Sequence, residues 1–474
     1  MNLVAPDVNY YSMLPFITVL LTAVFATILP FYVSRKAIAG LSAVGLLVAL
    51  AASIGLWNTN LSSFYGAYRA DNFALGFGIV LIVGALITVI SSVDVAKRGG
   101  TMQAEFFAIL LYAVSGTMLL ASAHDLIVLL IGFEVMSLGV YVLSSFKETA
   151  NSEEAGLKYF LLGSFASAIL IFGIALVFGA TGKFGLEAIN TSVLSPEFKN
   201  SSIAAVGALF IMIGFGFKVA MAPFHQWTPD VYTGAPTVVT QFMSVAVKAA
   251  AFAGFLHIFG LALQNVSGWQ TPLQFLIALT LMIGNLAALR QSNLKRMLAY
   301  SSVAHAGYVG LAVLASPSQG FSSALYYLGV YTLMNAGAFA VLNVLSKDDD
   351  GLEIESLAGL GSSKPLLAAT LTFFLLSLAG IPPLGGFIGK YLIFSAAASS
   401  GYYGLVILAA LTSAVSLAYY LRPIGLMYFR PRVTVLPDFS GRSTRVLLVV
   451  CAVGVLILGL VPNAVYGLLE LVKK

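Results

Sequence analysis

Long apolar segments separated by short polar connections dominate the pattern of this 474-residue chain. A helix needs roughly 20 apolar residues to cross the hydrocarbon core of a bilayer. Fourteen segments approach or exceed that length, which predicts an all-α polytopic membrane protein with about fourteen transmembrane helices. The predicted spans are 14–33, 37–57, 72–94, 104–122, 125–146, 157–180, 203–221, 236–261, 272–289, 297–315, 321–345, 366–396, 402–428 and 445–469.

Proline and glycine interrupt two of these spans. The seventh runs into Ala222-Pro223, and the twelfth contains Pro382-Pro383 flanked by glycines. Proline removes a backbone donor and glycine loosens a helix. Broken backbone at membrane depth is tolerated only inside protein or along a wet cavity. Both breaks are therefore predicted to lie in the protein interior.

The two breaks suggest an internal duplication. Spans four to eight contain one broken helix with a nearby lysine, and so do spans nine to thirteen. Five is an odd number, so a second copy of the unit enters the membrane upside down, as in many transporters. We therefore expect two inverted five-helix repeats, each with one broken helix. The predicted units are residues 1–103, 104–261, 270–428 and 429–474.

The basic residues predict the orientation of the chain. Connections after even-numbered spans carry only Arg69, Lys183 and Lys199. Connections after odd-numbered spans carry Arg35, Lys36, Lys97, Arg98, Lys147, Arg290, Lys295, Arg296, Lys347, Lys364, Arg430, Arg432, Arg442 and Arg445. Basic connections stay in the cytoplasm, which places the N-terminus outside. Lys473 and Lys474 fall on the opposite side from this rule.

Composition excludes several classes of function. Hydrophobic residues make up 59% of the chain and charged residues 9%, far below the charge of a soluble domain. The net charge of +5 is scattered, so no nucleic-acid partner is expected. The single cysteine, Cys451, cannot form an intrachain disulfide, a Cys-type zinc site or an iron–sulfur cluster. Residues 14–33 are interpreted as a retained span, and no nucleotide loop, metal-ligand cluster or nucleophile triad is recognisable.

Four ionisable residues lie inside predicted spans: Glu134, Lys218, Lys248 and Lys390. A charge at mid-bilayer costs roughly 2.5–3.5 kcal/mol on insertion scales. Lys248 lies about 18 Å from either end of its span at 1.5 Å per residue, too far for its side chain to reach water. Burial disfavours the charged form of a lysine and a nearby carboxylate favours it. Such a pair can take up and release a proton, which is what a proton path requires.

Simpler interpretations remain open for each of these residues. Lys218 lies near a helix end and could extend toward the interface. Lys390 could cap carbonyls freed by the second break, and Glu134 could be a fixed partner of a lysine. Lys248 is the hardest to explain by structure alone.

Further polar residues have weaker assignments. Two interpretations of Lys158 have equal weight: a surface lysine, or a residue at which protons enter. His225 and His305, each taken alone, are most simply hydrogen-bonded histidines. His124 and His257 lie near span ends and receive no role.

Longer motifs give a resemblance to a family. Residues 217–232 (FKVAMAPFHQWTPDVY) resemble the seventh-span motif of the antiporter-like subunits of respiratory complex I. Residues 233–237 and 242–250 (FMSVAVKAA) narrow the resemblance to subunit N of bacterial NADH–quinone oxidoreductases, the counterpart of mitochondrial subunit 2. Residues 156–165, 294–302 (LKRMLAYSS) and 380–390 fit as well. The resemblance runs from about residue 70 to residue 430.

The resemblance implies a role for each buried residue. Glu134 and Lys218 would be the paired glutamate and lysine of a first half-channel. Lys248 would be the central lysine between the halves. Lys390 would lie on the second broken helix nearest the exit. His305 would lie on the hydrated axis that joins them.

The first hypothesis is therefore a proton-translocating membrane subunit of a redox-driven NADH–quinone oxidoreductase in a bacterial cytoplasmic (inner) membrane. The chain itself would bind no cofactor. FMN, iron–sulfur clusters and quinone are expected on partner subunits. Its direct partners would be lipid and other membrane subunits, both antiporter-like and small helical ones. The hydrophilic redox arm would be an indirect partner. The electron donor of the complex would be NADH or ferredoxin. The alternatives are a subunit of a multisubunit cation/proton antiporter and a non-transporting scaffold.

Overall fold

The computed structural model describes residues 7–95, 103–195, 202–347, 351–463 and 467, and they are overwhelmingly helical. The first half contains α1 (Leu14–Ile28), α2 (Arg35–Gly55), α3 (Asn72–Val95), α4 (Ala104–Ser122), α5 (Leu126–Ser144), α6 (Ala150–Thr181), α7 (Leu186–Leu194), α8 (Ser202–Lys218), α9 (Trp227–Gly234), α10 (Thr237–Phe242) and α11 (Lys248–His257). The second half contains α12 (Gln270–Leu289), α13 (Leu294–Leu314), α14 (Pro317–Leu345), α15 (Leu360–Ser363), α16 (Pro365–Ala379), α17 (Gly385–Ser399), α18 (Tyr403–Phe429) and α19 (Arg442–Leu460).

The predicted number of spans is confirmed. Twelve helical runs among the described residues are long and apolar enough to cross a membrane. One of them, 237–262, joins α10 and α11 through a π-helical turn at Met243–Val247. The other two predicted spans are the broken pairs α8–α9 and α16–α17, whose halves are too short to cross alone. The fold is thus an all-α polytopic membrane fold with two broken helices.

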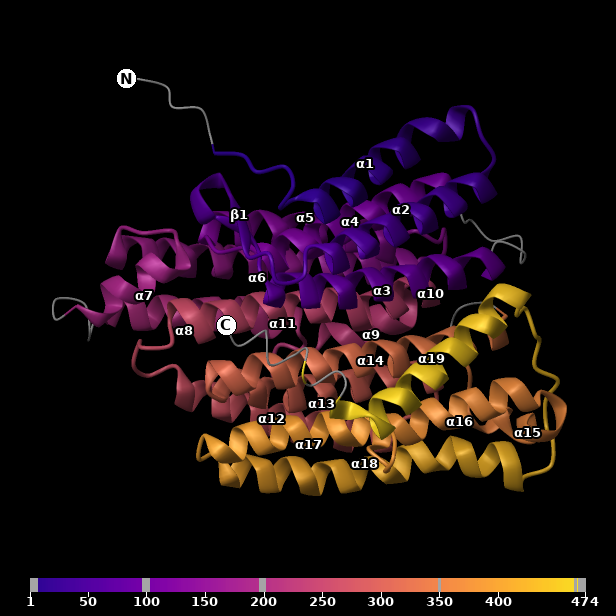
Figure 1. Ribbon diagram of the computed structural model, residues 1–474. Coiled ribbons are helices and arrows are strands. Elements are labelled where there is room, and N and C mark those ends of the chain that lie inside the picture. Colours follow the sequence, from indigo (N-terminus) through magenta and orange to yellow (C-terminus); the bar gives the residue numbers. More distant parts are fainter. Residues whose placement is uncertain (1–6, 96–102, 196–201, 348–350, 464–466, 468–474) are drawn as a thin grey trace.

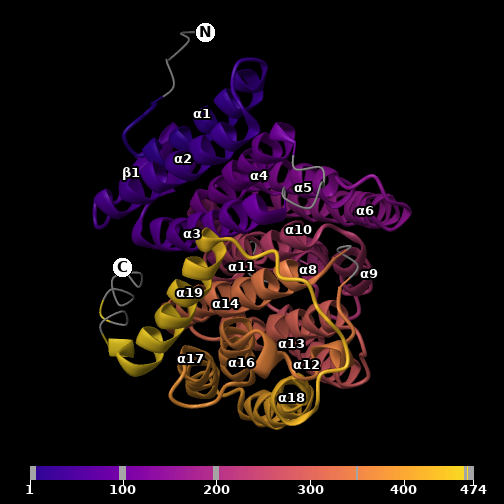
Figure 2. The same ribbon diagram turned by 90° about the vertical axis from the view of Figure 1, so that its right-hand side faces the viewer.

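The helices form one bundle, with the N-terminal helices along one side of it. Seen along the helices, α1 and α2 lie at one side, the helices from α4 to α11 follow, and α12 to α18 lie at the other side (Figure 2). The packing of α10 against α14 joins the two five-helix repeats, and α3 of the N-terminal unit also packs on α14. Because each repeat has an odd number of spans, α8–α9 and α16–α17 run in opposite directions (Figure 1). The division of the chain after residues 103, 261 and 428 stays a prediction.

A short β-hairpin marks one end of the bundle. It consists of β1 (Leu61–Ser63) and β2 (Tyr68–Ala70), and α7 lies at the same end (Figure 1). We call this end the hairpin face and the opposite end the basic face. The described cations of the basic face include Arg35, Lys36, Lys147, Arg290, Arg296, Lys364 and Arg430. Lys97, Arg98, Lys199, Lys473 and Lys474 lie outside the described residues.

Some helix ends differ from the prediction because polar turns extend the helices. α6 begins at Ala150 rather than at residue 157, since Thr149 accepts a hydrogen bond from the Ser152 amide and caps a polar first turn. Hydropathy alone does not detect such a turn. The hairpin and α7 were also missed because each is too short to give a periodic signal.

Close helix packing depends on glycine. In α4 and α5, Gly116 and Gly132 face each other, and a Cβ on Gly132 would lie 2.5 Å from the Leu120 amide nitrogen. Backbone atoms cannot move aside as a flexible side chain can. The absence of a side chain therefore allows these helices to approach each other closely.

We expect Gly132→Ala to destabilise the assembled protein by about 1–3 kcal/mol through overpacking. Gly179→Ala on α6 is the matched control, because nothing lies within 4 Å of its added methyl group. The control should be neutral or slightly stabilising, since alanine is the better helix former. Thermal unfolding of the purified protein in detergent measures both changes. Equal melting temperatures for the two variants would contradict the packing argument.

Candidate functional site

The first break separates α8 from α9 next to a buried lysine. Helix α8 ends at Lys218, and Ala220 takes a left-handed conformation with φ of 65°. The Trp227 indole donates a hydrogen bond to the Phe217 carbonyl at 3.0 Å. The Ala222 amide donates to the hydroxyl of Thr280 on α12. The break is therefore held by the protein interior, as expected for irregular backbone at membrane depth.

The second break has the same plan. Helix α16 ends at Ala379, Gly380 takes a φ of 89°, and α17 begins at Gly385. Here the ammonium of Lys390 donates to the freed Ala379 carbonyl at 3.0 Å. The capping interpretation of Lys390 thus describes one of its contacts. A side chain that carries an N–H group stabilises the end of the first half-helix at both breaks.

Lys218 lies in an aromatic enclosure. Its side chain is 2% exposed, so it does not extend to the interface. Its ammonium lies 5.4 Å from the ring centre of Phe133 and 5.0 Å from those of Tyr141 and Tyr159. Within the described part of the chain it has no hydrogen-bond partner. Ring faces attract a cation, but they leave the ammonium without an acceptor.

Glu134 lies on α5 directly after Phe133, whose ring centre is 5.4 Å from the Lys218 ammonium. One of its carboxylate oxygens, Oε1, is buried and lacks a hydrogen-bond partner among the described residues. Since the Lys218 ammonium also has no partner among them, no direct bond joins the two side chains. They are thus neighbours without a direct bond, and Glu134 is not a fixed salt-bridge partner of this lysine.

Lys248 joins the two repeats. It begins α11, directly after the π-helical turn Met243–Val247, and is 2% exposed. Its ammonium donates to the carbonyl of Ser302 at 2.6 Å and to the Ser302 hydroxyl at 2.5 Å. Ser302 lies on α13, in the second repeat. The central lysine is therefore bonded across the boundary between the repeats.

His305 lies one helical turn after Ser302 and is held between two tyrosines. Its Nδ1 lies 2.5 Å from the hydroxyl of Tyr327, and its Nε2 lies 3.1 Å from that of Tyr420. Tyr420 also bonds the hydroxyl of Ser301. A hydroxyl can both donate and accept a hydrogen bond. The donor and the acceptor can therefore exchange roles in each hydrogen bond of this set.

Lys390 lies on α17, directly after the second break. Besides Ala379, its ammonium donates to the hydroxyl of Ser413 on α18 at 2.8 Å, and it lies 4.8 Å from the ring centre of Tyr308. Asn285 bonds the hydroxyls of Tyr308 and Tyr419. The buried lysine of the second repeat therefore bonds one carbonyl and one hydroxyl and lies over one aromatic ring.

Sequence reasoning found the charged residues of this series but missed the hydroxyl groups between them. The sequence analysis gave Tyr327 and Tyr420 no role, yet both are fully buried. Serine in a membrane helix usually bonds its own backbone. The position of the two tyrosines in the middle of predicted spans could have revealed them, because the hydroxyl of a buried tyrosine usually needs a hydrogen-bond partner.

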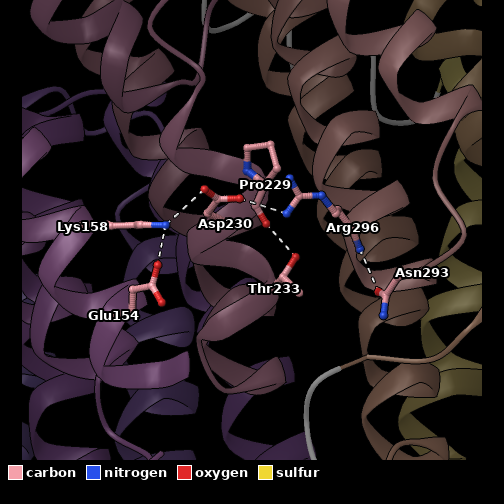
Figure 3. Close-up of polar contacts among 7 residues, drawn as sticks. All are labelled: Glu154, Lys158, Pro229, Asp230, Thr233, Asn293 and Arg296. Atoms are coloured by element: carbon pink, nitrogen blue, oxygen red, sulfur yellow. Dashed lines mark hydrogen bonds and ion pairs between the residues drawn. The ribbon is translucent and has the colours of Figure 1, made fainter. Parts of the chain in front are cut away.

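Lys158 lies in an ion network on the basic face. Its ammonium lies 2.6 Å from Glu154 and 3.4 Å from Asp230, which also accepts a hydrogen bond from Arg296 at 2.9 Å (Figure 3). These residues line a cavity of about 250 Å³. The side chain of Lys158 is 43% exposed, so it is a surface lysine beside a cavity. Asp230 connects α6 of the first repeat to α13 of the second.

Lys295, the neighbour of Arg296, was expected in a solvated connection but is fully buried. Its ammonium donates to the carbonyls of Thr233 at 3.0 Å and Ala235 at 2.8 Å, at the end of α9. A cation is stabilised at the C-terminal end of a helix, where carbonyls lack partners. The short half-helix α9 is thus held from α13 by Lys295 and Arg296 together.

We expect Lys295→Met to destabilise the protein more than Asp230→Asn does. Hydrogen bonds from a buried charge contribute about 1.5–3 kcal/mol, whereas exposed ion pairs contribute about 0–1 kcal/mol. Thermal unfolding of the two purified variants measures the difference. A larger loss for Asp230→Asn would show that the ion network, and not Lys295, holds α9.

Comparison with known proteins agrees with this arrangement. Residues 123–416 match the family described as NADH:quinone oxidoreductase/Mrp antiporter, transmembrane. The NADH-quinone oxidoreductase subunit N of Deinococcus radiodurans is 46% identical, over 98% of this chain and 97% of that protein.

Solved structures show the same fold. A chain of respiratory complex I from Thermus thermophilus is 38% identical, with a TM-score of 0.84, over 96% of this chain and 98% of that one. A chain of the Mrp complex from Dietzia sp. has a TM-score of 0.84 over 98% of this chain and 97% of that one. It is only 20% identical and therefore shows a shared fold alone. The chain belongs to the subunit N family of the NADH–quinone oxidoreductases, membrane subunits of the antiporter-like class.

Proposed function

We propose that this chain moves protons along Lys218, Lys248 and Lys390 during quinone reduction elsewhere in the complex. The observation that supports this most directly is the bond of Lys248 to Ser302, because that bond joins helices of the two repeats. Loss of the proton from Lys248 frees a lone pair that can accept a new one. Ser301, Tyr420 and His305 form a hydrogen-bonded set on α13 and α18, within the second repeat.

Glu134 sets the charge state of Lys218 in this proposal. A movement that brings the carboxylate closer favours the ammonium form, and a movement away favours release. Lys158 would gather protons on the basic face, where its cavity opens. Lys390 would pass the proton on at the second break. Each lysine thus acts as a proton carrier whose affinity is changed by its neighbours.

The chain would pump as one subunit of a translocase and would carry no redox centre of its own. FMN, iron–sulfur clusters and quinone would belong to partner subunits. Other antiporter-like and small helical subunits would cover the exposed apolar faces of helices such as α2 and α18, with the redox arm acting indirectly. The basic face would lie in the bacterial cytoplasm and the N-terminus on the periplasmic side, because basic connections are retained inside.

The test is to purify the intact complex and reconstitute it in vesicles. We expect flavin and iron–sulfur absorbance to copurify with this chain, and NADH with a quinone to drive proton transport. Sodium-dependent proton flux without any redox partner would instead support the antiporter alternative. An assembly that oxidises NADH but builds no proton gradient would overturn the pumping role.

A further inference from the structure

The hairpin end of the first repeat is closed by a small hydrogen-bonded cap. Tyr68 pairs with Ala123, and Asp125 pairs with Gly185. The His124 amide donates to the Ala67 carbonyl, and the His124 carbonyl accepts from the Leu186 amide, both at 2.9 Å. Both backbone groups of His124 are thus used in the cap. Its side chain points to the interior and is 5% exposed.

Beneath this cap, two histidines and a carboxylate meet. His124 Nε2 lies 3.4 Å from a carboxylate oxygen of Asp71, and the His124 ring lies 4.8 Å from that of His257. His257 Nδ1 lies 3.1 Å from the Ala123 carbonyl. The ring of Phe73 stacks on His257 at 4.1 Å. Residues from three separate helical segments are therefore gathered around one polar spot.

The hydrogen-bond partners define which nitrogens are free to accept a proton. A carbonyl oxygen only accepts, so His257 Nδ1 carries the hydrogen and its Nε2 holds the lone pair. His124 Nε2 faces the Asp71 carboxylate at 3.4 Å, a distance at which a protonated imidazole forms an ion pair with it. His124 Nδ1 is buried and has no partner within the described residues. His257 therefore keeps a basic nitrogen, Nε2, while His124 has an unpartnered Nδ1 and lies next to a carboxylate that stabilises an added positive charge.

A cavity of about 650 Å³ connects this spot with the hairpin face. Arg69 and Glu187 form an exposed ion pair at 2.6 Å in its wall. The charged and titratable groups around the histidines are Asp7, Tyr65, Arg69, Asp71 and Glu187. Burial lowers the pKa of His124, and the Asp71 carboxylate opposes that effect. Arg69 holds the pKa of Glu187 below its usual range, so this carboxylate stays charged.

The helix that carries His257 also carries Lys248. A π-helical turn, Met243–Val247, directly precedes Lys248, and a second one, Ile258–Ala262, directly follows His257. Such turns are rare and frequently mark functional sites. At 1.5 Å per residue, the two side chains are attached about 13 Å apart along the helix. Both ionisable residues of this helix thus lie beside a local widening of the helix.

We propose that Asp71, His124 and His257 form a proton-binding site that exchanges protons with the aqueous phase at the hairpin face. One proton from water adds to a free imidazole nitrogen, and the resulting imidazolium is neutralised by Asp71. Its release returns the proton to the same water phase. The use of this site as a release station for pumped protons rests on the proposed function, whereas proton binding itself does not.

Diethyl pyrocarbonate labelling of the intact purified complex, followed by mass spectrometry, tests the site directly. The reagent acylates neutral imidazole, so the labelling rate reports protonation at each pH. We expect the rates at His124 and His257 to fall together as the pH is lowered. We expect Asp71→Asn to raise the rate at His124 severalfold at mildly acidic pH, because the imidazolium loses its counter-charge.

Two controls separate this site from a purely structural pair. Lys183→Gln changes an exposed charge at the same face and should leave both labelling curves unchanged. His124→Gln should shift the curve of His257 if the two share a proton. Independent titration of the histidines, or no labelling of either, overturns the proposal. A complex that labels as expected but does not pump leaves the site intact and removes only its role in release.

Discussion

Replacing Lys248 with methionine should lower the initial rate of NADH-driven proton transport at least about tenfold, equivalent to a barrier rise of about 1.4 kcal/mol. The side chains have similar lengths, so the packing of α11 against α13 is kept. The ammonium that bonds Ser302 is lost, and with it the carrier between the repeats. Insertion should improve, because a buried charge costs roughly 2.5–3.5 kcal/mol. Proton uptake by reconstituted vesicles gives the rate, and native gels give the assembly.

Lys248→Arg is the decisive control. Arginine keeps the positive charge and can still donate to Ser302, but it does not release its proton in proteins. A carrier must release its proton, so the arginine variant should fail as the methionine variant does. If arginine restores full transport, Lys248 is a structural cation and the series of proton carriers is broken at its centre.

The positions of the helices were largely readable from the sequence, because hydropathy and helix length are tied to the thickness of the bilayer. The predicted span 104–122 coincides with α4, and 236–261 differs from the observed run 237–262 by one residue. The two breaks were also predicted, since proline and glycine interrupt a helix and are visible in the sequence. The helix ends that were predicted wrongly, such as the start of α6, depend on capping by single polar side chains.

The partners of the buried charges could not be predicted from span positions. Nothing along the chain shows that Lys248 bonds Ser302, because that contact joins residues on helices from different repeats. Lys295 reads as one more cation in a basic connection, yet it is buried against the end of α9. A hydropathy pattern gives the depth of a residue but not the direction in which its side chain points.

The same limit explains the two histidines at the hairpin face. His124 and His257 lie near the ends of different spans, and each taken alone is unremarkable. Their ring centres lie 4.8 Å apart because the hydrogen bonds of the cap hold residues 123–125 across the end of the bundle. A three-residue connection gives no sequence pattern for such a cap. Only the fold shows that these side chains share one cavity.

Glu134→Gln and Lys218→Met are each expected to reduce proton transport strongly, and the double variant to be no worse than the poorer single variant. If the two side chains act as one unit, removal of either member removes the function, and the second change has nothing left to affect. A pair of independent contributions would instead multiply. The measurement is a double-mutant cycle on NADH-driven proton transport at a fixed level of assembly.

The geometry makes this cycle interpretable. Removing one member of a direct buried salt bridge leaves an unpaired charge and destabilises a protein by about 3–5 kcal/mol. Glu134 and Lys218 form no such bridge, and the Lys218 ammonium lies among aromatic rings instead. The single variants should therefore fold and assemble nearly as well as the unchanged chain. Lost assembly in both would indicate a structural pair, whereas lost transport with intact assembly identifies a pair that acts through its charge.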